Sequence, residues 1–387
     1  MSMILSSENV VEYLKSCGFL ELNDEANTKI EPKLAKNFNL LLTLANGRKL
    51  LIKQESLNQE GKTSGEFLWE WKIQEFVQKF SELSQIRHWI SEAIHFNLDD
   101  SIIIFNYLDN YRDVMAFYGK ENIFPPEIAS AIGKVIASIH SLTFDHTDYQ
   151  AFFTQKQENE SSENLSYLIN NLGRIGPEIF ASVPSEGLKF FALYQRYDSL
   201  GQAIAELVNS LKPSCVTHND LKLNNILLAK DWEQNIGNNT IRLIDWERCS
   251  WGDPAFDLGT LIGSYLRIWL SSMITNKTMS IDQSLRMATT PLEVMQPSIA
   301  NLLIAYLNHF PEILEHRPDF LRRVIQFAGW DLIIAIQSTL QYQKTFGNTG
   351  ICMLQVAKSL LCRPEASIPT VFGMQASELT STSLSPV

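Results

Sequence analysis

Three polar side chains, His218, Asp220 and Asn225, follow the pattern His-x-Asp-x₄-Asn in a short polar run between two apolar runs. A second carboxylate, Asp245, ends the mostly aliphatic run Ile241–Ile244. Transfer of a phosphoryl group uses such side chains. One carboxylate orients and deprotonates the attacking hydroxyl, while an amide oxygen and a second carboxylate hold the magnesium ions that bridge nucleotide phosphates. These residue types therefore predict phosphoryl-transfer chemistry.

The surrounding pattern predicts the elements that position these residues. The apolar runs 214–217 and 226–228 read as short buried strands, which puts the polar residues on a loop. The polar segment Asp231–Thr240 reads as a turn that leads into the strand ending at Asp245. A segment with the sequence Gly-Asp-Pro-Ala-Phe-Asp-Leu-Gly, Gly252–Gly259, follows. Far upstream, Arg48–Lys53 reads as a strand that carries a lysine.

In this order the motifs resemble those of the aminoglycoside phosphotransferase and choline kinase family, more than those of the protein kinases. The resemblance implies an α+β, bilobal protein-kinase-like fold. Residues 1–108 would form a small β-rich nucleotide-binding lobe with the hinge at its end. Residues 109–370 would form a mostly helical lobe with the catalytic loop and the acceptor pocket. Residues 371–387 are rich in Ser and Thr, which favours a disordered tail.

The resemblance also implies roles for single residues, with ATP and Mg²⁺ as cofactors. Asp220 would be the catalytic base, and Asn225 and Asp245 would chelate magnesium. Lys53 would contact the α- and β-phosphates of the nucleotide. Glu70, on the helix expected at 65–80, would pair with Lys53; Glu66 and Glu75 are the competing candidates for this pairing.

Further contacts to the nucleotide follow from the same resemblance. The turn that contains Lys36 and Asn37 would lie over the phosphates, and backbone groups from Asn106 to Leu108 would bind the adenine ring. Within the catalytic loop, His218 would support the loop, and Lys222 would either neutralise phosphoryl charge or face solvent. Asp257 would anchor the loop by accepting backbone N–H bonds. His140, near the end of a helix expected at 125–142, is interpreted as a packing residue without a chemical role.

The composition narrows the class of protein. A chain of 387 residues is long enough for two lobes, and 45% hydrophobic with 19% charged residues is typical of a globular protein. The net charge of −11 argues against a nucleic-acid partner. The five cysteines form no CxxC pair, which predicts neither a disulfide framework nor a zinc site. The sequence lacks a membrane-length apolar stretch and a secretion signal, so we expect a cytoplasmic protein without a membrane partner.

The acceptor is expected to be the hydroxyl of a small molecule such as an aminoglycoside, choline, homoserine or a sugar. Asp245 and Asp257 are separated by a short connection without the long activation segment and Ala-Pro-Glu motif of protein kinases. Two alternatives stay open: a kinase acting on Ser or Thr of a peptide, and a pseudokinase-like nucleotide-binding module. Acceptor contacts are expected from residues 151–184 and from the helices after Asp257. The acidic run 155–163 is either a solvated loop or a rim for a cationic acceptor, and the oligomeric state is left open.

Overall fold

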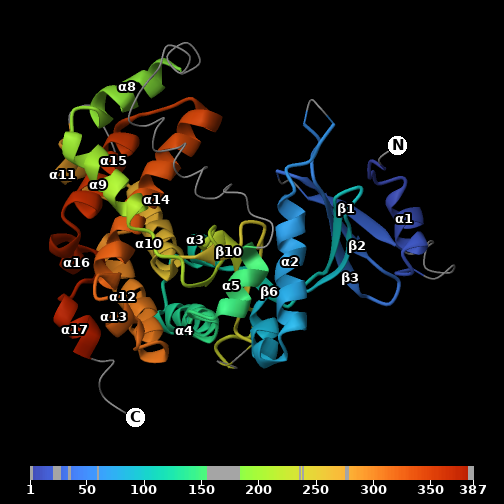
Figure 1. Cartoon of the computed structure of the whole chain (residues 1–387). Coiled ribbons are helices and arrows are strands. Elements are labelled where there is room, and N and C mark those ends of the chain that lie inside the picture. The colour runs from blue at the N-terminus through green and yellow to red at the C-terminus, as the bar shows by residue number, and fades with distance from the viewer. Residues whose placement is uncertain are drawn as a thin grey trace. The chain divides into compact units, whose positions relative to one another are not determined.

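The computed structural model describes residues 3–20, 28–33, 36–58, 61–154, 184–234, 237, 239–274 and 279–381. The chain forms two compact units (Figure 1). Unit 1 comprises residues 1–114 and 225–249, and unit 2 comprises residues 115–224 and 250–387. The predicted single division at residue 108 therefore differs from these units, because a later segment of the chain returns to unit 1. The acidic run 155–163, and with it most of the segment 151–184 from which acceptor contacts are expected, lies outside the described residues.

Unit 1 is built on a five-stranded antiparallel sheet of order β1-β2-β3-β5-β4. Its strands are β1 (Lys29–Lys33), β2 (Phe38–Thr43), β3 (Lys49–Gln54), β4 (Ala93–Asn97) and β5 (Ile102–Asn106). One face packs on α1 (Val10–Ser16), and the other packs on α2 (Glu66–Lys79), as Figure 1 shows. A 3₁₀ helix follows α2 at Ser81–Trp89. A second sheet of order β6-β8-β9 contains β6 (Tyr111–Asp113), β8 (Ile226–Ala229) and β9 (Ile241–Leu243).

Unit 2 is mostly helical and contains one two-stranded sheet, in which β7 (Cys215–Thr217) pairs with β10 (Ser250–Gly252). The longest helices pack in pairs: α12 against α4, and α14 against both α10 and α15. A short 3₁₀ turn covers Leu223–Asn225 at the unit boundary. The helices are α3 (Val114–Glu121), α4 (Pro126–Thr143), α5 (Thr147–Thr154), α8 (Ser185–Tyr194), α9 (Asp198–Asn209), α10 (Pro254–Ser271), α11 (Ile281–Arg286), α12 (Leu292–His309), α13 (Ile313–His316), α14 (Phe320–Gln343), α15 (Asn348–Cys362), α16 (Pro364–Phe372) and α17 (Ala376–Ser381).

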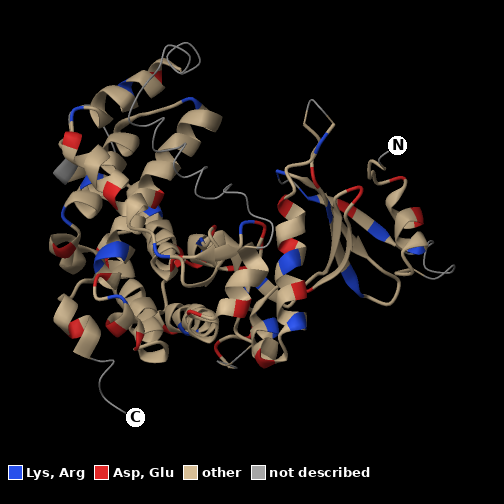
Figure 2. Cartoon of the chain, in the orientation of Figure 1, with Lys and Arg blue, Asp and Glu red and all other residues tan. Residues whose placement is uncertain are grey.

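The structure confirms the predicted fold class, since a β-rich N-terminal part is followed by a mostly helical remainder. The prediction of a disordered tail from residue 371 is wrong for the residues described. There α16 continues to Phe372 and α17 follows, because Leu379 is fully buried against the neighbouring helices. All five cysteines are free thiols. In the part of the chain that the structure describes, no helix combines the length and apolar character needed to cross a bilayer. Acidic and basic residues are interspersed within each unit (Figure 2).

Candidate functional site

Lys53 lies on the face of the unit 1 sheet that α2 covers. Exposure alternates along β3, so that Leu50, Ile52 and Gln54 are buried on one face and Lys53 points to the other. There its ammonium Nζ forms an ion pair with Asp245 Oδ1 at 2.5 Å and lies 5.2 Å from the centre of the Phe105 ring. Burial alone would lower the pKa of Lys53, but the nearby carboxylates, Asp245 foremost, raise it above its usual value. Lys53 is therefore a buried, permanently charged ammonium.

Glu70, on α2, is fully buried, and its carboxyl group interacts electrostatically with the Lys53 ammonium. The backbone N–H of Trp246 stabilises the charged form of its carboxyl group, and the ion pair of Lys53 goes to Asp245 rather than to Glu70. Burial raises the pKa of Glu70 to about 8, although Lys53 opposes this rise. Of the two competing candidates, Glu66 pairs with Lys36, and Glu75 accepts a hydrogen bond from the Trp71 indole at 3.1 Å. Of the three candidate glutamates on this helix, Glu70 is therefore the one whose carboxyl group acts on the Lys53 ammonium.

Asn225 and Asp245 lie side by side because β8 pairs with β9. Ile226 is opposite Leu243 in the antiparallel register, and the Ile244 N–H donates to the Asn225 carbonyl at 3.0 Å. Asp245 adopts a left-handed backbone conformation, with φ of 61°, directly after the strand. Aspartate and asparagine tolerate this conformation better than most residues. The strand pairing therefore delivers an amide and a carboxylate to one end of the hairpin, next to Lys53.

This donor set fits a magnesium ion. Three carboxyl groups, Asp245, Glu70 and Glu247, act electrostatically on the ammonium of Lys53. Burial, together with repulsion from Glu66 and Asp245, raises the pKa of Glu247. A divalent cation would relieve that repulsion. Among the described residues no group of three His, Cys, Asp or Glu side chains could hold a metal by itself. Mg²⁺ typically takes only one or two protein carboxylates and completes its coordination with phosphate oxygens and water.

The remaining residues predicted to bind nucleotide also lie in unit 1. Lys36 pairs with both oxygens of Glu66, at 2.5 and 2.6 Å, and the Asn37 side chain lies 3.5 Å from the Ser56 N–H. The Asn106 N–H donates to Glu92 O, and the Tyr107 N–H donates to Lys49 O. The Leu108 carbonyl accepts from Tyr111. The N–H groups of Asn106 and Tyr107 are therefore engaged in backbone hydrogen bonds within unit 1, and the binding of adenine by backbone groups of residues 106–108 stays a prediction.

The catalytic-loop residue Asp220 lies in unit 2, directly after β7. Its backbone N–H lies 3.3 Å from His218 Nδ1, and its Oδ2 pairs with Lys222 Nζ at 2.8 Å. The His218 ring therefore supports the loop, as predicted, and Lys222 forms an ion pair with Asp220. Asp257, in the first turn of α10, accepts the N–H groups of His218 and Asn219 at 2.7 and 2.8 Å. The predicted anchoring role of Asp257 is confirmed.

His140 was interpreted from the sequence as a packing residue, but it completes the anchor of the catalytic loop. Its Nε2 lies 3.3 Å from Asp257 Oδ2, and its Nδ1 lies 3.0 Å from the Tyr306 hydroxyl. Burial alone would raise the pKa of Asp257, yet the contacts with His140 and His218 hold it below its usual value. Asp257 therefore remains a carboxylate that can accept several hydrogen bonds. The pattern of α4 gave no signal for this contact, because its partner is 117 residues away.

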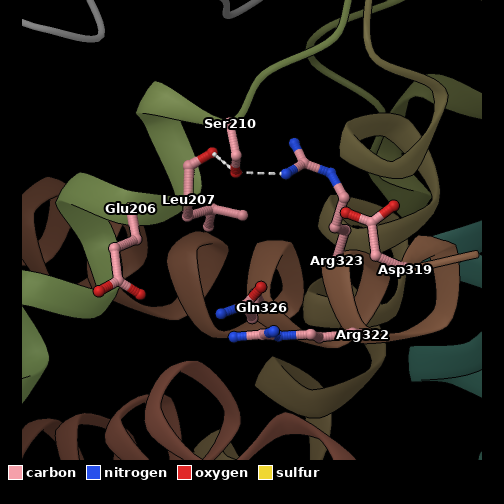
Figure 3. Close-up of a pocket in the computed structure, with 7 residues that line it drawn as sticks. All are labelled: Glu206, Leu207, Ser210, Asp319, Arg322, Arg323 and Gln326. Carbon is pink, nitrogen blue, oxygen red and sulfur yellow. Dashed lines mark hydrogen bonds between the residues drawn. The ribbon is translucent and has the colours of Figure 1, made fainter. Parts of the chain in front are cut away.

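The start of α10, which carries Asp257, is fixed by a second buried carboxylate. Asp253 caps the helix by accepting the Ala255 N–H at 3.1 Å, and it also accepts from Arg317 at 2.9 Å and Arg323 at 2.7 Å. Arg323 in addition donates to Ser210, in a polar pocket of about 220 Å³ (Figure 3). The pocket is lined by Glu206, Leu207, Ser210, Asp319, Arg322, Arg323 and Gln326. Because the two buried arginines already bind protein groups, we assign this region to the anchoring of α10.

The predicted site residues thus fall into two sets. Unit 1 brings Lys53, Glu70, Asn225 and Asp245 together, and unit 2 holds Asp220 with Lys222. A single loop links the sets in the chain, since Asn225 follows Asp220 by five residues.

Comparisons with known proteins found similar phosphotransferases and kinases. A family model described as the phosphotransferase enzyme family matches residues 119–277, which include the catalytic loop, Asp245 and Asp257. The chain is also 23% identical over 186 residues to a 4-hydroxytryptamine kinase from Psilocybe cyanescens. That match covers 46% of this chain and 47% of the relative, so the chain spans about half the length of the curated relative.

Two solved structures share the fold over nearly the whole chain. A choline kinase from Cryptosporidium parvum is 14% identical with a TM-score of 0.53, and the alignment covers 98% of this chain and 100% of the other. A protein assigned to the aminoglycoside phosphotransferases, from Ralstonia eutropha, is 11% identical with a TM-score of 0.51, covering 92% and 96%. The family model supports the resemblance to phosphotransferases over residues 119–277, and the two solved structures show that the chain shares the fold of a choline kinase and of a protein assigned to the aminoglycoside phosphotransferases.

Proposed function

We propose that this protein is an ATP- and Mg²⁺-dependent phosphotransferase that moves the γ-phosphate to a hydroxyl group of a small molecule. The observation that carries the proposal is the pairing of β8 with β9, which places Asn225 and Asp245 side by side and brings the Asp245 carboxylate to the Lys53 ammonium. An ammonium for phosphates beside a carboxylate and an amide for magnesium is the arrangement that nucleotide-dependent phosphoryl transfer requires. The match to a phosphotransferase family model supports the same class.

Each residue then has a distinct role in the proposed reaction. Asp245 and Asn225 would hold the magnesium ion, which would neutralise part of the phosphate charge, and Lys53 would bind phosphate oxygens of the ATP that supplies the phosphoryl group. Asp220 orients the acceptor hydroxyl and takes its proton, while Asp257 keeps the loop in position through two backbone N–H groups. The acceptor named for the curated relative, 4-hydroxytryptamine, is a small hydroxyl compound of the kind proposed here.

The roles of the metal ligand and the base are separable by experiment. ATP should raise the Tm of the wild type more with Mg²⁺ than with EDTA, because a ligand that binds only the folded state stabilises it by mass action. Asp245→Asn should remove most of that difference, and asparagine keeps the left-handed backbone accessible. Asp220→Ala should keep the Mg²⁺-dependent shift but lower ADP release with an acceptor by roughly 10²- to 10⁴-fold. An unchanged shift in Asp245→Asn would remove Asp245 from the metal site.

A further inference from the structure

The face of the unit 1 sheet that packs on α1 carries three neighbouring side chains that have no part in the proposed reaction. Cys17 caps the C-terminal end of α1, and its Sγ lies 3.7 Å from Nε2 of His95, on β4. Tyr13, one turn earlier on α1, is buried, and its hydroxyl group interacts with the Cys17 thiol. These residues are separated from the proposed nucleotide site, since Lys53 points to the opposite face of the sheet.

The five cysteines differ in what surrounds their thiol groups. Cys249 and Cys362 donate to backbone carbonyl oxygens, each at 3.5 Å, which stabilises the neutral thiol. Cys215 and Cys352 are buried, and burial raises the pKa of both thiols. Cys17 is partly exposed, and the imidazole nitrogen beside it is a group that can accept the thiol proton. Its surroundings therefore favour reaction of the sulfur, whereas those of the other four favour the thiol.

His95 lies at an irregularity of the sheet. The pairing of β4 with β5 shifts register between Ala93 and His95, and such a bulge changes the direction in which a side chain points. The imidazole ring lies edge-on to the ring of Phe19, with 5.6 Å between the ring centres. Loss of hydration in this environment lowers the pKa of His95. The imidazole is therefore neutral around neutral pH and is able to take up a proton.

Tyr13 supplies a hydrogen-bond donor to the same sulfur. The carbonyl groups at the C-terminal end of α1 disfavour a negative charge at Cys17, so a thiolate there has to be stabilised by side chains. The Tyr13 hydroxyl makes no hydrogen bond of normal geometry among the described residues. Burial first, and then the charges of Cys17 and Asp100, raise the pKa of Tyr13 well above its usual value. The phenol therefore keeps its proton and can donate it to a thiolate.

We propose that Cys17 is a modification site whose thiol forms a mixed disulfide with a low-molecular-weight disulfide, with His95 as the base. His95 Nε2 takes the thiol proton while Sγ attacks one sulfur of the disulfide. A new S–S bond forms as the old one breaks, and the leaving thiolate receives the proton from His95. One thiol and one disulfide thus give one mixed disulfide and one thiol, so that no further oxidant is consumed. The site does not depend on the proposed phosphotransferase reaction.

The test uses bis(hydroxyethyl) disulfide, a neutral probe, and follows the adduct at each cysteine by peptide mass mapping at several pH values. In the folded wild type, Cys17 should react about tenfold faster or more than Cys362, the other partly exposed thiol, because an unassisted thiol is mostly protonated near neutral pH. In denaturant the two cysteines should react at similar rates. His95→Gln should reduce the rate at Cys17 to that at Cys362 and should move its rise to higher pH, where a thiol ionises without help.

Two further variants separate chemistry from folding. His88→Gln, at an exposed histidine of the same unit, should react like the wild type. Tyr13→Phe keeps the ring in the core but removes the hydroxyl, and it should also slow the reaction at Cys17.

The inference is overturned if Cys362 reacts as fast as Cys17 in the folded wild type. It is also overturned if folded His95→Gln keeps the rate and the pH dependence of the wild type. Thermal melts show whether each variant is folded. If His95→Gln is unfolded, the comparison of the two cysteines in the wild type and the rate in Tyr13→Phe decide the outcome.

Discussion

Glu70 places a carboxyl group where water cannot stabilise its charge. The usual pKa of a glutamate is 4.5, whereas burial raises that of Glu70 to about 8, with only partial opposition from Lys53. Around neutral pH the group is therefore mostly protonated, and the ammonium of Lys53 is balanced by Asp245. This distribution of charge differs from the simple Lys53–Glu70 pair that the family resemblance implies.

A dependence of stability on pH follows from this shift. Between pH 4.5 and about 8 the folded state holds the Glu70 proton more tightly than the unfolded chain does, so the stabilisation is complete below pH 4.5 and is lost as the pH rises through 8. Without nucleotide or magnesium, the Tm of the wild type should fall relative to that of Glu70→Gln over this range, as measured by thermal melts at several pH values. Glu75→Gln, on the same helix but outside the buried cluster, is the matched control. Parallel melting curves for wild type and Glu70→Gln would contradict the shift.

At the scale of the elements, the close contact between α4 and α12 helps to position the anchor of the catalytic loop. Gly133, on α4, lies directly against the backbone of Leu302 on α12, and a β-carbon there would meet the Leu302 carbonyl oxygen. The anchor of the catalytic loop spans the same helix pair, since His140 is on α4 and Tyr306 is on α12. The spacing of these two helices is therefore coupled to the position of Asp257.

Gly133→Ala should lower the free energy of unfolding by about 1–3 kcal/mol, because a close backbone contact cannot accommodate a methyl group without a shift. Denaturant unfolding measures this change. Gly119→Ala is the control, since nothing lies within 4 Å of the β-carbon position there. In a helix that substitution should be neutral or stabilise by about 0.5–1 kcal/mol. Equal destabilisation by both substitutions would show that α4 and α12 tolerate a wider spacing.

The sequence predicted elements with strong periodicity or motifs, and it missed those with weak ones. The strand that carries Lys53 contains a short aliphatic run, and the helix at 126–143 has an apolar stripe, so both were predicted within a few residues. The strand at 29–33 was missed, because Pro32 and its charged residues mask the pattern of an edge strand. The break at 195–197 between α8 and α9 is not marked in the sequence by any Gly or Pro.

The sequence could not predict which side chains form ion pairs and hydrogen bonds with one another, and the reason is different. Local pattern places Lys53, Glu70 and Asp245 on suitable elements, but only tertiary packing decides which carboxylate meets the ammonium. The same holds for His140 and for His95, whose contacts with Asp257 and Cys17 join distant parts of the chain. The sequence therefore indicated which residues could belong to the site, but it did not indicate which of them pair across the fold.

At the scale of the whole molecule, the C-terminal segment is part of the packed helical unit. Helix α17 lies against α12 and α16, and its Leu379 is fully buried. Leu379→Ala should reduce the free energy of unfolding by roughly 2–5 kcal/mol, through lost burial and the cavity that remains. Leu98→Ala, at a side chain that is 65% exposed, should change it by less than about 0.5 kcal/mol. Equal effects in urea unfolding would mean that α17 contributes little to the stability of the unit.

Unit 1 is made of two separate segments of the chain, and this affects how it can fold during synthesis. The five-stranded sheet is encoded before residue 107, but β8 and β9, which complete the unit with Asn225 and Asp245, come after the intervening residues 115–224 of unit 2. At about 5–20 residues per second, a ribosome needs roughly 5–20 s to make that segment. During this interval the nascent sheet contains Lys53 without Asp245. The first unit to begin folding therefore cannot finish before part of the second has been synthesised, and its charge-bearing site is assembled last.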